Sequence, residues 1–321
     1  MDMRIQDIAK EAGVSTATVS RVFGNHPNVR KDVREHVFEV ARRHGYRPRL
    51  SAKKRNVVVI TPSRIAQPVQ SYTEMVLSEV VRELSQHGYR VEILPEDNVE
   101  FLSGIQFCGV VAIVHDGTVA ESWAERFDAP LVMVNFEMPK ASEGVFSVSS
   151  DESQGMELAV RHLAGHGHVR IGAMVFGSPE GGRNPMRRAG ILASFSKWRV
   201  QSDETLVRFA GESDYMEVIG SLLREGITGL LCTGENSGIM AAYALSLFSK
   251  RIPLDVSLIA FERAMVSRYC VPAQTAITQD YAALAVAAAD AIDARLDGRS
   301  FPRQTFIPYK LLERDSVARR N

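Results

Sequence analysis

Short side chains that can form hydrogen bonds follow one another in the run Ser15-Thr-Ala-Thr-Val-Ser-Arg21. Ser15 is a good N-cap for a helix that would run from Thr16 to Phe23. A helix that begins with small or hydrogen-bonding side chains can enter the major groove of DNA and contact base edges and phosphates. The residues that would face outward for this purpose are Thr16, Ala17, Ser20 and Arg21.

Three short helices are needed to position that segment. Apolar residues at helical spacing from Ile5 to Ala12 predict a first helix, which Gly13 ends in a turn. The second helix turns Val19 and Val22 inward, and a third is expected from the apolar spacing of residues 33–41, ending around Gly45. Two short helices around Ala-Gly-Val-Ser make a helix-turn-helix, so the sequence predicts an all-α headpiece.

Charge is divided unevenly along the chain. Over all 321 residues Lys+Arg and Asp+Glu are both 38. Residues 1–55 nevertheless carry thirteen Lys and Arg against six Asp and Glu, a net charge of +7, which leaves −7 for residues 56–321. A basic module joined to an acidic body is typical of a nucleic-acid binder, because Lys and Arg displace counterions from phosphates. A solvated charged face would not account for the sharp change near residue 55.

The motifs of the basic module resemble a known family. Gly13–Val22 reads Gly-Val-Ser-x-x-Thr-Val-Ser-Arg-Val, and Gly45–Pro48 reads Gly-Tyr-x-Pro. Residues 5–48 are thereby similar to the headpiece of the LacI/GalR family of bacterial transcription regulators, which usually repress. One headpiece reads only a half-site, so a homodimer on a palindromic double-stranded DNA operator is expected. The DNA-binding residues that the resemblance implies are Arg4, Ile5, Ser15, Thr16, Ala17, Ser20, Arg21, Asn25, Arg30, Ala52 and Arg55.

The chain departs from the family pattern at two places in this region. The family loop begins with Asn, whereas here Gly24 precedes Asn25. The contact of this Asn with a phosphate or base is therefore expected to be shifted or absent. The family's hinge helix wedges a Leu into the minor groove, whereas Arg55 stands at that position here, and the link to the first strand is several residues shorter. Arg enters a narrow minor groove but is a poor apolar wedge, so this hinge is not expected to insert an apolar wedge that kinks DNA.

The remaining chain alternates short apolar runs with amphipathic stretches, including candidate helices at residues 72–87 and 154–166. Such alternation predicts parallel sheets covered on both faces, and 266 residues exceed one ordinary sheet domain. We therefore expect a two-lobed α/β body, which in the resembled family is periplasmic-binding-protein-like. The division expected is a headpiece of residues 1–48, a hinge of 49–56 and a body of 57–321. The expected strands are Val57–Ile60, Val91–Leu94, Val110–Val114, Leu131–Val134, Ile171–Phe176, Leu230–Cys232 and Leu258–Phe261.

The resemblance also implies an effector site between the lobes. Arg and carboxylate side chains fork onto vicinal hydroxyls while an aromatic ring covers an apolar sugar face, so a sugar-like ligand is plausible. Arg187 is the residue expected to hold the ligand, with Glu235 or Glu262 as its partner when no ligand is bound. Those two Glu stand where the family has Asp, and Gly234 replaces an Asn, which indicates a reshaped pocket. The positions implied are Gln154, Arg187, Tyr215, Glu235, Glu262, Gln279 and Tyr281.

Several classes of protein are disfavoured. The three cysteines are far apart, and His162, His166 and His168 lack a completing carboxylate or thiol, so neither a disulfide framework nor a metal site is expected. No cofactor is expected either. No apolar run approaches the ~18–20 residues that span a bilayer, and the start is not a signal peptide, so a cytoplasmic protein is expected.

Three functional hypotheses remain open. The first is a DNA-binding regulator controlled by a small metabolite. The second is a DNA-binding regulator controlled by a partner protein, with a vestigial cleft. The third is an enzyme, such as a hydrolase, fused to a DNA-binding head; no nucleophile elbow, metal ligand set or acid-base pair supports it, so the chain is not expected to be an enzyme.

Overall fold

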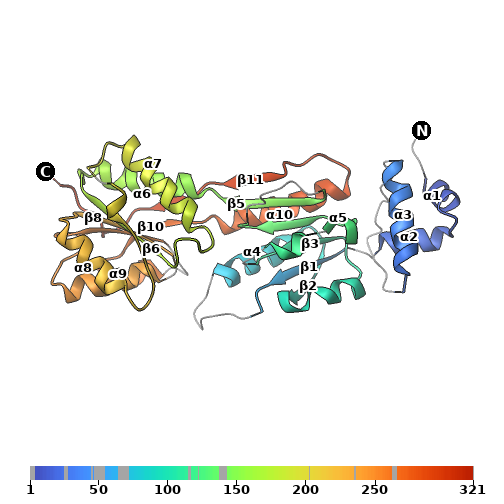
Figure 1. Cartoon of the computed structure of the whole chain (residues 1–321), viewed down its shortest axis with the longest axis horizontal. Coiled ribbons are helices and arrows are strands. Elements are labelled where there is room, and N and C mark those ends of the chain that lie inside the picture. Colours follow the sequence, from blue (N-terminus) through green and yellow to red (C-terminus); the bar gives the residue numbers. More distant parts are fainter. Residues whose placement is uncertain are drawn as a thin grey trace. The chain divides into compact units, whose positions relative to one another are not determined.

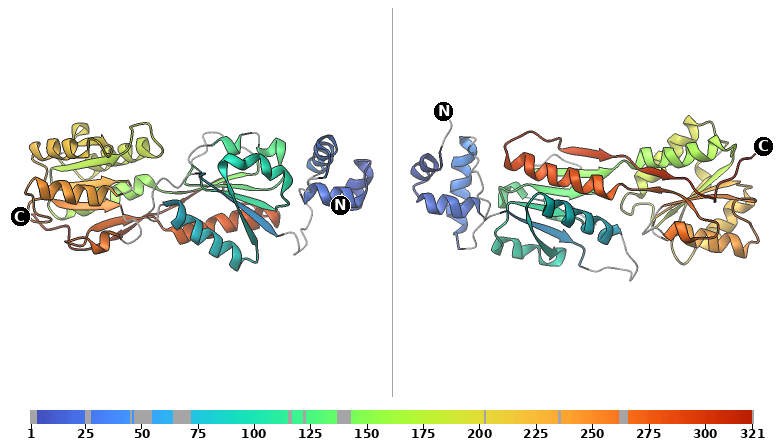
Figure 2. Two further views of the ribbon diagram at one scale, coloured as in Figure 1. Left: turned by 90° about the horizontal axis from the view of Figure 1, so that it is seen from below. Right: turned by 180° about the vertical axis from the view of Figure 1, so that it is seen from behind.

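The computed structural model describes residues 4–24, 28–44, 46, 55–63, 72–114, 117–121, 123–136, 143–201, 203–234, 236–261 and 266–320. Its contacts divide the chain into two compact units. The first comprises Met1–Pro68, Thr73–Ser149 and Tyr281–Phe306, and it holds the headpiece and the first lobe. The second comprises Val69–Tyr72, Ser150–Asp280 and Ile307–Asn321. Figures 1 and 2 show the elements of each unit.

The headpiece is a three-helix module with its own apolar core. Its helices are α1 (Ile5–Glu11), α2 (Thr16–Phe23) and α3 (Lys31–Arg43). Gly13 has a φ of +65°, a left-handed conformation that glycine adopts without strain, in the turn between the first two helices. The backbone N–H of Thr18 donates to Ser15 Oγ at 3.0 Å, so the predicted N-cap is confirmed. Val19 and Val22 are fully buried as predicted, in a core that also contains Ile8, Val37 and Phe38.

The first lobe is a six-stranded sheet in the order β11-β5-β4-β3-β1-β2, with parallel pairing between β5, β4, β3, β1 and β2. Trp123, Phe107 and Phe127 pack together over one face, and α10 contacts β3 and β4. The strands are β1 (Asn56–Thr61), β2 (Arg90–Pro95), β3 (Gly109–Ala112), β4 (Leu131–Val134), β5 (Val145–Ser150) and β11 (Gln304–Ile307). The helices are α4 (Tyr72–Gln86), α5 (Trp123–Arg126) and α10 (Tyr281–Leu296), with 3₁₀ segments η2 (Glu96–Gly104) and η3 (Thr118–Ala120).

The second lobe repeats this plan in the order β12-β10-β9-β8-β6-β7, parallel except for the edge strand β12. Figure 1 shows α6 and α7 on one side of the sheet and α8 and α9 on the other, each pair with its own apolar core. The strands are β6 (Ile171–Phe176), β7 (Val207–Ala210), β8 (Gly229–Thr233), β9 (Ser257–Phe261), β10 (Thr275–Thr278) and β12 (Lys310–Leu312). The helices are α6 (Glu152–Gly165), α7 (Asn184–Lys197), α8 (Tyr215–Arg224), α9 (Ser237–Leu247) and the 3₁₀ segments η4 (Glu204–Leu206) and η5 (Val266–Tyr269).

The predicted fold class, an all-α helix-turn-helix headpiece with a two-lobed α/β body of parallel sheets, is confirmed. The seven predicted strands are all present within two residues of their expected ends, and both predicted helices of the body are found. The three cysteines are free thiols; Cys108 and Cys232 are buried and Cys270 is half-buried. Residues 49–54 of the predicted hinge (49–56) lie outside the described residues, as do residues 47 and 48 at the end of the predicted headpiece.

Candidate DNA-binding face and effector site

The exposed face of α2 carries the residues expected to touch DNA. Thr16, Ala17 and Arg21 are exposed and Ser20 is half-buried, while the apolar side of the same helix is buried in the headpiece core. The Ser15 hydroxyl caps the helix: its Oγ accepts from the Thr18 N–H and also lies 2.9 Å from Thr18 Oγ1. The helix therefore presents two small side chains at its N-terminus and a guanidinium one turn later, which suits base contact followed by phosphate contact.

The other expected headpiece contacts have different environments. Arg4 is exposed and precedes α1, where its backbone N–H donates to Asp7 Oδ2 at 2.8 Å. Ile5 is half-buried and packs against the headpiece core, which assigns it a structural role as well. Arg30 is exposed and forms an ion pair with Asp32. Asn25 and Ala52 lie outside the described residues.

Arg55, predicted at the wedge position of the hinge, is held by the first lobe. Its guanidinium lies 4.7 Å from the centroid of the Tyr89 ring, and its Nη2 lies 3.9 Å from Asp293 Oδ1. Its carbonyl accepts a hydrogen bond of 2.8 Å from the N–H of Arg90, which joins the start of β1 to β2. These contacts give Arg55 a structural role that the sequence did not reveal, and its contact with DNA stays a prediction.

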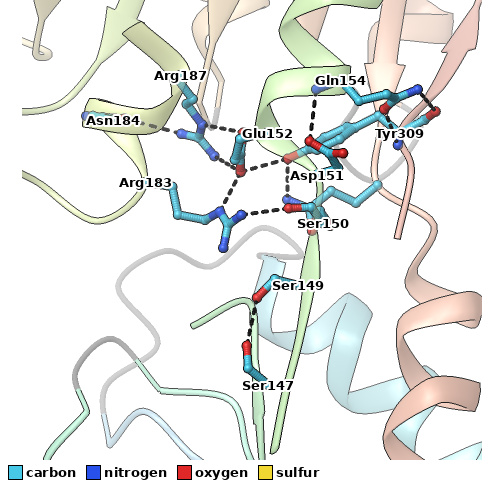
Figure 3. Close-up of polar contacts among 11 residues, drawn as sticks. Ser147, Ser149, Ser150, Asp151, Glu152, Gln154, Arg183, Asn184, Arg187 and Tyr309 are labelled. Atoms are coloured by element: carbon cyan, nitrogen blue, oxygen red, sulfur yellow. Dashed lines mark hydrogen bonds and ion pairs between the residues drawn. The ribbon is translucent and has the colours of Figure 1, made fainter. Parts of the chain in front are cut away.

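A buried ionic cluster lies at the start of α6 and α7 (Figure 3). The Glu152 side chain is 1% exposed and accepts hydrogen bonds from Arg183 Nε at 2.8 Å and Arg187 Nε at 3.1 Å. Tyr309 Oη donates to the same carboxylate at 2.9 Å. Arg187 also donates from Nη1 to Asn184 Oδ1 at 3.3 Å, and its guanidinium lies 5.0 Å from the centroid of the Phe261 ring. The arginine is therefore fixed in orientation within one lobe.

The charges of this cluster support one another. Burial favours the neutral acid, but the positive charges of Arg187 and Arg183 outweigh it and lower the pKa of Glu152 below its ordinary value. Burial also works against a charged Arg187, yet the Glu152 carboxylate raises the pKa of that guanidinium. Burial and the Glu152 charge raise the pKa of the Tyr309 phenol well above 10, so this hydroxyl remains a donor. The site is thus an ionised pair of opposite charges with a neutral phenol beside it.

The structure brings three of the expected effector residues to this cluster. Gln154 holds the backbone of Tyr309 with both ends of its amide, since Oε1 accepts from the Tyr309 N–H at 2.8 Å and Nε2 donates to the Tyr309 carbonyl at 3.3 Å. Gln279 Nε2 donates to Tyr309 Oη at 3.2 Å. Arg187 completes the group through Glu152. The cluster therefore contains a polar network around the residue expected to bind the ligand.

The remaining expected effector residues are placed elsewhere or not described. Tyr215 begins α8 and packs against the core beneath α8 and α9, and no hydrogen bond of the described residues links it to the cluster. Tyr281 begins α10 in the first unit. Glu235 and Glu262 lie outside the described residues, so the partner of Arg187 that the structure does show is Glu152.

Sequence reasoning missed Glu152, Arg183 and Tyr309. Each looks ordinary along the chain, and the contacts join residues 31 to 157 positions apart. The one available signal was a Glu directly before the apolar run of α6, where a carboxylate is stabilised by the helix dipole. Burial of that carboxylate, and hence its need for positive partners, is visible only in the fold.

Other classes of site find no support in the part of the chain that the structure describes. It contains no group of three or more His, Cys, Asp or Glu side chains able to hold a metal ion. His168 is buried, with Nδ1 3.0 Å from Thr228 Oγ1 and Nε2 3.0 Å from the carbonyl oxygen of Ala318. None of the described helices has the length and apolar character needed to span a bilayer.

Comparison with known proteins agrees with this architecture. Residues 4–49 match bacterial regulatory proteins of the lacI family, and residues 160–317 match a periplasmic binding protein-like domain. The HTH-type transcriptional regulator GalR of Escherichia coli (strain K12) is 26% identical over 338 residues, covering 98% of this chain and 95% of GalR.

Two solved structures share the fold of the whole chain. The lac repressor dimer bound to operator and the anti-inducer ONPF gives a TM-score of 0.68 at 21% identity, covering 99% of this chain and 100% of that one. The complex of the transcriptional regulator CelR with cellobiose gives 0.70 at 21% identity, covering 98% and 99%. The chain therefore carries a helix-turn-helix domain of the lacI family and a periplasmic-binding-protein-like domain, and its homologues are transcriptional regulators of the LacI/GalR family.

Proposed function

We propose that this regulator is a cytoplasmic repressor, acting as a homodimer on a palindromic operator and controlled by a small sugar-like effector. In this proposal residues 1–48 bind DNA, residues 49–56 form a short hinge, and residues 57–321 bind the effector and dimerise. The observation that carries the DNA-binding part is the exposed face of α2, with Thr16 and Ala17 at a capped N-terminus on a headpiece of net positive charge. The chain works as a binding protein and not as an enzyme.

The effector part is supported by the cluster around Arg187. This side chain lies on α7, which follows the carboxyl end of β6, and ligands of open parallel sheets gather at the carboxyl ends of the strands. Its Nε, Nη1 and Nη2 donate to Glu152 and Asn184, and Phe261 covers one guanidinium face. Hydroxyl oxygens are suitable acceptors for such donors. The structural relative CelR was solved as a complex with cellobiose, which supports a sugar-like ligand here.

The DNA-binding proposal is tested by operator selection from a random library with the full-length chain. Exchange of Thr16 and Ala17 should change which bases are preferred, by about 1–3 kcal/mol per base pair. Arg21→Ala is the control, because loss of a phosphate contact should weaken all sequences alike and reduce the dependence of log K on log salt by about 0.9. An unchanged base preference after the Thr16 and Ala17 exchange would refute this docking.

A regulator controlled by a partner protein is the second candidate. The observation in its favour is that the Glu152 carboxylate already occupies two donors of Arg187, as a ligand would. A panel of monosaccharides and disaccharides in a thermal-shift assay separates the two, since a ligand that binds only the folded chain raises its apparent stability by RT ln(1 + [L]/Kd). A sugar that raises Tm and alters operator affinity establishes effector control, whereas no response across the panel favours the partner protein.

A further inference from the structure

The chain passes between its two units at three well-described points, and all three lead to the same cluster. These points are Ser149–Ser150, Asp280–Tyr281 and Phe306–Ile307; the excursion of Val69–Tyr72 is mostly outside the described residues. On the side of the second unit, Glu152 lies two residues beyond Ser150, Gln279 one residue before Asp280 and Tyr309 two residues beyond Ile307. The segments that must bend when lobes move therefore begin at residues that contact one another.

Tyr309 is the residue that joins the three segments. Its hydroxyl donates to Glu152 Oε1 at 2.9 Å and accepts from Gln279 Nε2 at 3.2 Å, so one oxygen bridges two crossings and belongs to the third. The backbone is joined as well, because the Asp151 N–H donates to the Ile307 carbonyl at 2.9 Å. Gln154 holds the backbone of Tyr309 with both amide atoms. These hydrogen bonds supply partners for the polar atoms of Tyr309, as a buried polar group requires.

We propose that Glu152, Gln279 and Tyr309 form a hinge anchor that keeps the three crossings moving as one body and connects them to Arg187. A negative charge or a hydroxyl oxygen placed at Arg187 competes with the Glu152 carboxylate for the N–H donors of Arg187, and the change at Glu152 reaches all three crossings through the Tyr309 hydroxyl. The anchor would pass the effect of a ligand at Arg187 to the three crossings, so this inference rests on the proposed function. Tyr309 acts here as a positioning residue.

The test measures how freely the two units move in the full chain without ligand. Spin labels are placed on Glu100→Cys in the first unit and Arg224→Cys in the second, both exposed positions, in a Cys270→Ser background. The labelled chain is mixed with excess unlabelled chain, so that only distances within one chain contribute to pulsed electron double resonance. Tyr309→Phe keeps the ring and removes the bridging oxygen. This variant should widen the distance distribution about twofold or add a second peak, because less populated arrangements of the two units become accessible.

Matched variants make the result specific. Tyr269→Phe removes an exposed hydroxyl in the same unit and should leave the distribution unchanged. Arg187→Lys keeps the charge but loses the guanidinium geometry and should widen it as Tyr309→Phe does. A parent-like width in Tyr309→Phe, with a folded circular dichroism spectrum, would overturn the anchor, and a parent-like width in Arg187→Lys would overturn its link to the effector site. Operator binding is measured separately, so a failure of the proposed DNA-binding function leaves this result interpretable.

Discussion

Glu152 shows how one buried carboxylate determines what substitutions of its partners can reveal. Because the Arg187 side chain is only 15% exposed, removing Glu152 leaves a buried guanidinium without its carboxylate, whereas removing Arg187 leaves Glu152 paired with Arg183. Glu152→Ala should therefore lower the free energy of unfolding by about 3–5 kcal/mol, measured by urea denaturation. Arg187→Ala shares part of this cost, so a lost effector response in that variant reports folding as well as binding.

The coupling between these two residues provides the control. The double variant Glu152→Met with Arg187→Met removes both charges of this pair, although Arg183 then loses its carboxylate partner, so its destabilisation should stay below the sum of the two single changes. Asp297→Ala, which breaks an exposed pair with Arg299, should leave the free energy of unfolding within experimental error. Additive single effects at residues 152 and 187 would contradict the buried pair.

Two histidines should give stability opposite dependences on pH. Burial lowers the pKa of His168, whose Nε2 donates to the Ala318 carbonyl at 3.0 Å while Nδ1 accepts from Thr228 Oγ1. As the pH falls below the ordinary value of 6.5, the unfolded chain binds a proton that the folded chain refuses, so stability falls by up to about 1.4 kcal/mol per pH unit. His168→Gln should flatten this fall between pH 7 and pH 5. Profiles of wild type and variant that run parallel would disprove it.

His87 is the matched comparison. Burial acts to lower the pKa of His87, but Asp293, 2.7 Å from its Nδ1, and Glu83 raise it above 6.5. This interaction stabilises the fold at low pH and is lost as the pH rises through the folded pKa, the reverse of His168. His87→Gln should therefore cost more free energy of unfolding at pH 6 than at pH 8. A cost independent of pH would show that the ion pairs do not form in solution.

At the scale of elements, helices and strands encoded by adjacent residues could be predicted from the sequence, whereas contacts between residues far apart in the chain could not. The N-cap at Ser15 and the β-branched runs of β1, β4 and β6 are encoded in a few adjacent residues, so their positions were predicted closely. The short strand β7 reads Val-Arg-Phe-Ala and the edge strand β12 Lys-Leu-Leu, which carry no clear period and were missed. Arg187 was identified by resemblance, while its partner Glu152 depends on packing of α6 against α7 and on Tyr309, which no local pattern encodes.

Helix α6 offers a test of how closely its first turns must pack. A Cβ added at Gly155 would lie 2.7 Å from Tyr309 Cδ2, whereas one added at Gly165 in the same helix meets nothing within 4 Å. Gly155→Ala should displace the Tyr309 ring and destabilise the chain by about 1–3 kcal/mol despite the better helix propensity of Ala. Gly165→Ala should be neutral or slightly stabilising in the same urea titration. Equal effects of the two substitutions would show that the ring does not pack on α6.

At the scale of the whole molecule, the proposed palindromic operator requires two headpieces held by their bodies. Ile239, Tyr243 and Leu247 on α9 are 42%, 57% and 57% exposed and recur every four residues, which puts them on one helix face. An exposed apolar stripe of this kind is typical of an association surface.

This face gives the last prediction. Tyr243→Glu with Leu247→Glu should convert the proposed dimer to monomers in sedimentation velocity, because the new charges would be desolvated if this face forms the interface. Operator affinity should then fall and become steeply dependent on protein concentration, since each half-site is bound separately. Phe101→Glu, a change of the same kind at an exposed apolar residue of the first lobe, is the control and should remain dimeric. If the α9 variant sediments as wild type does, the two headpieces are joined through another surface.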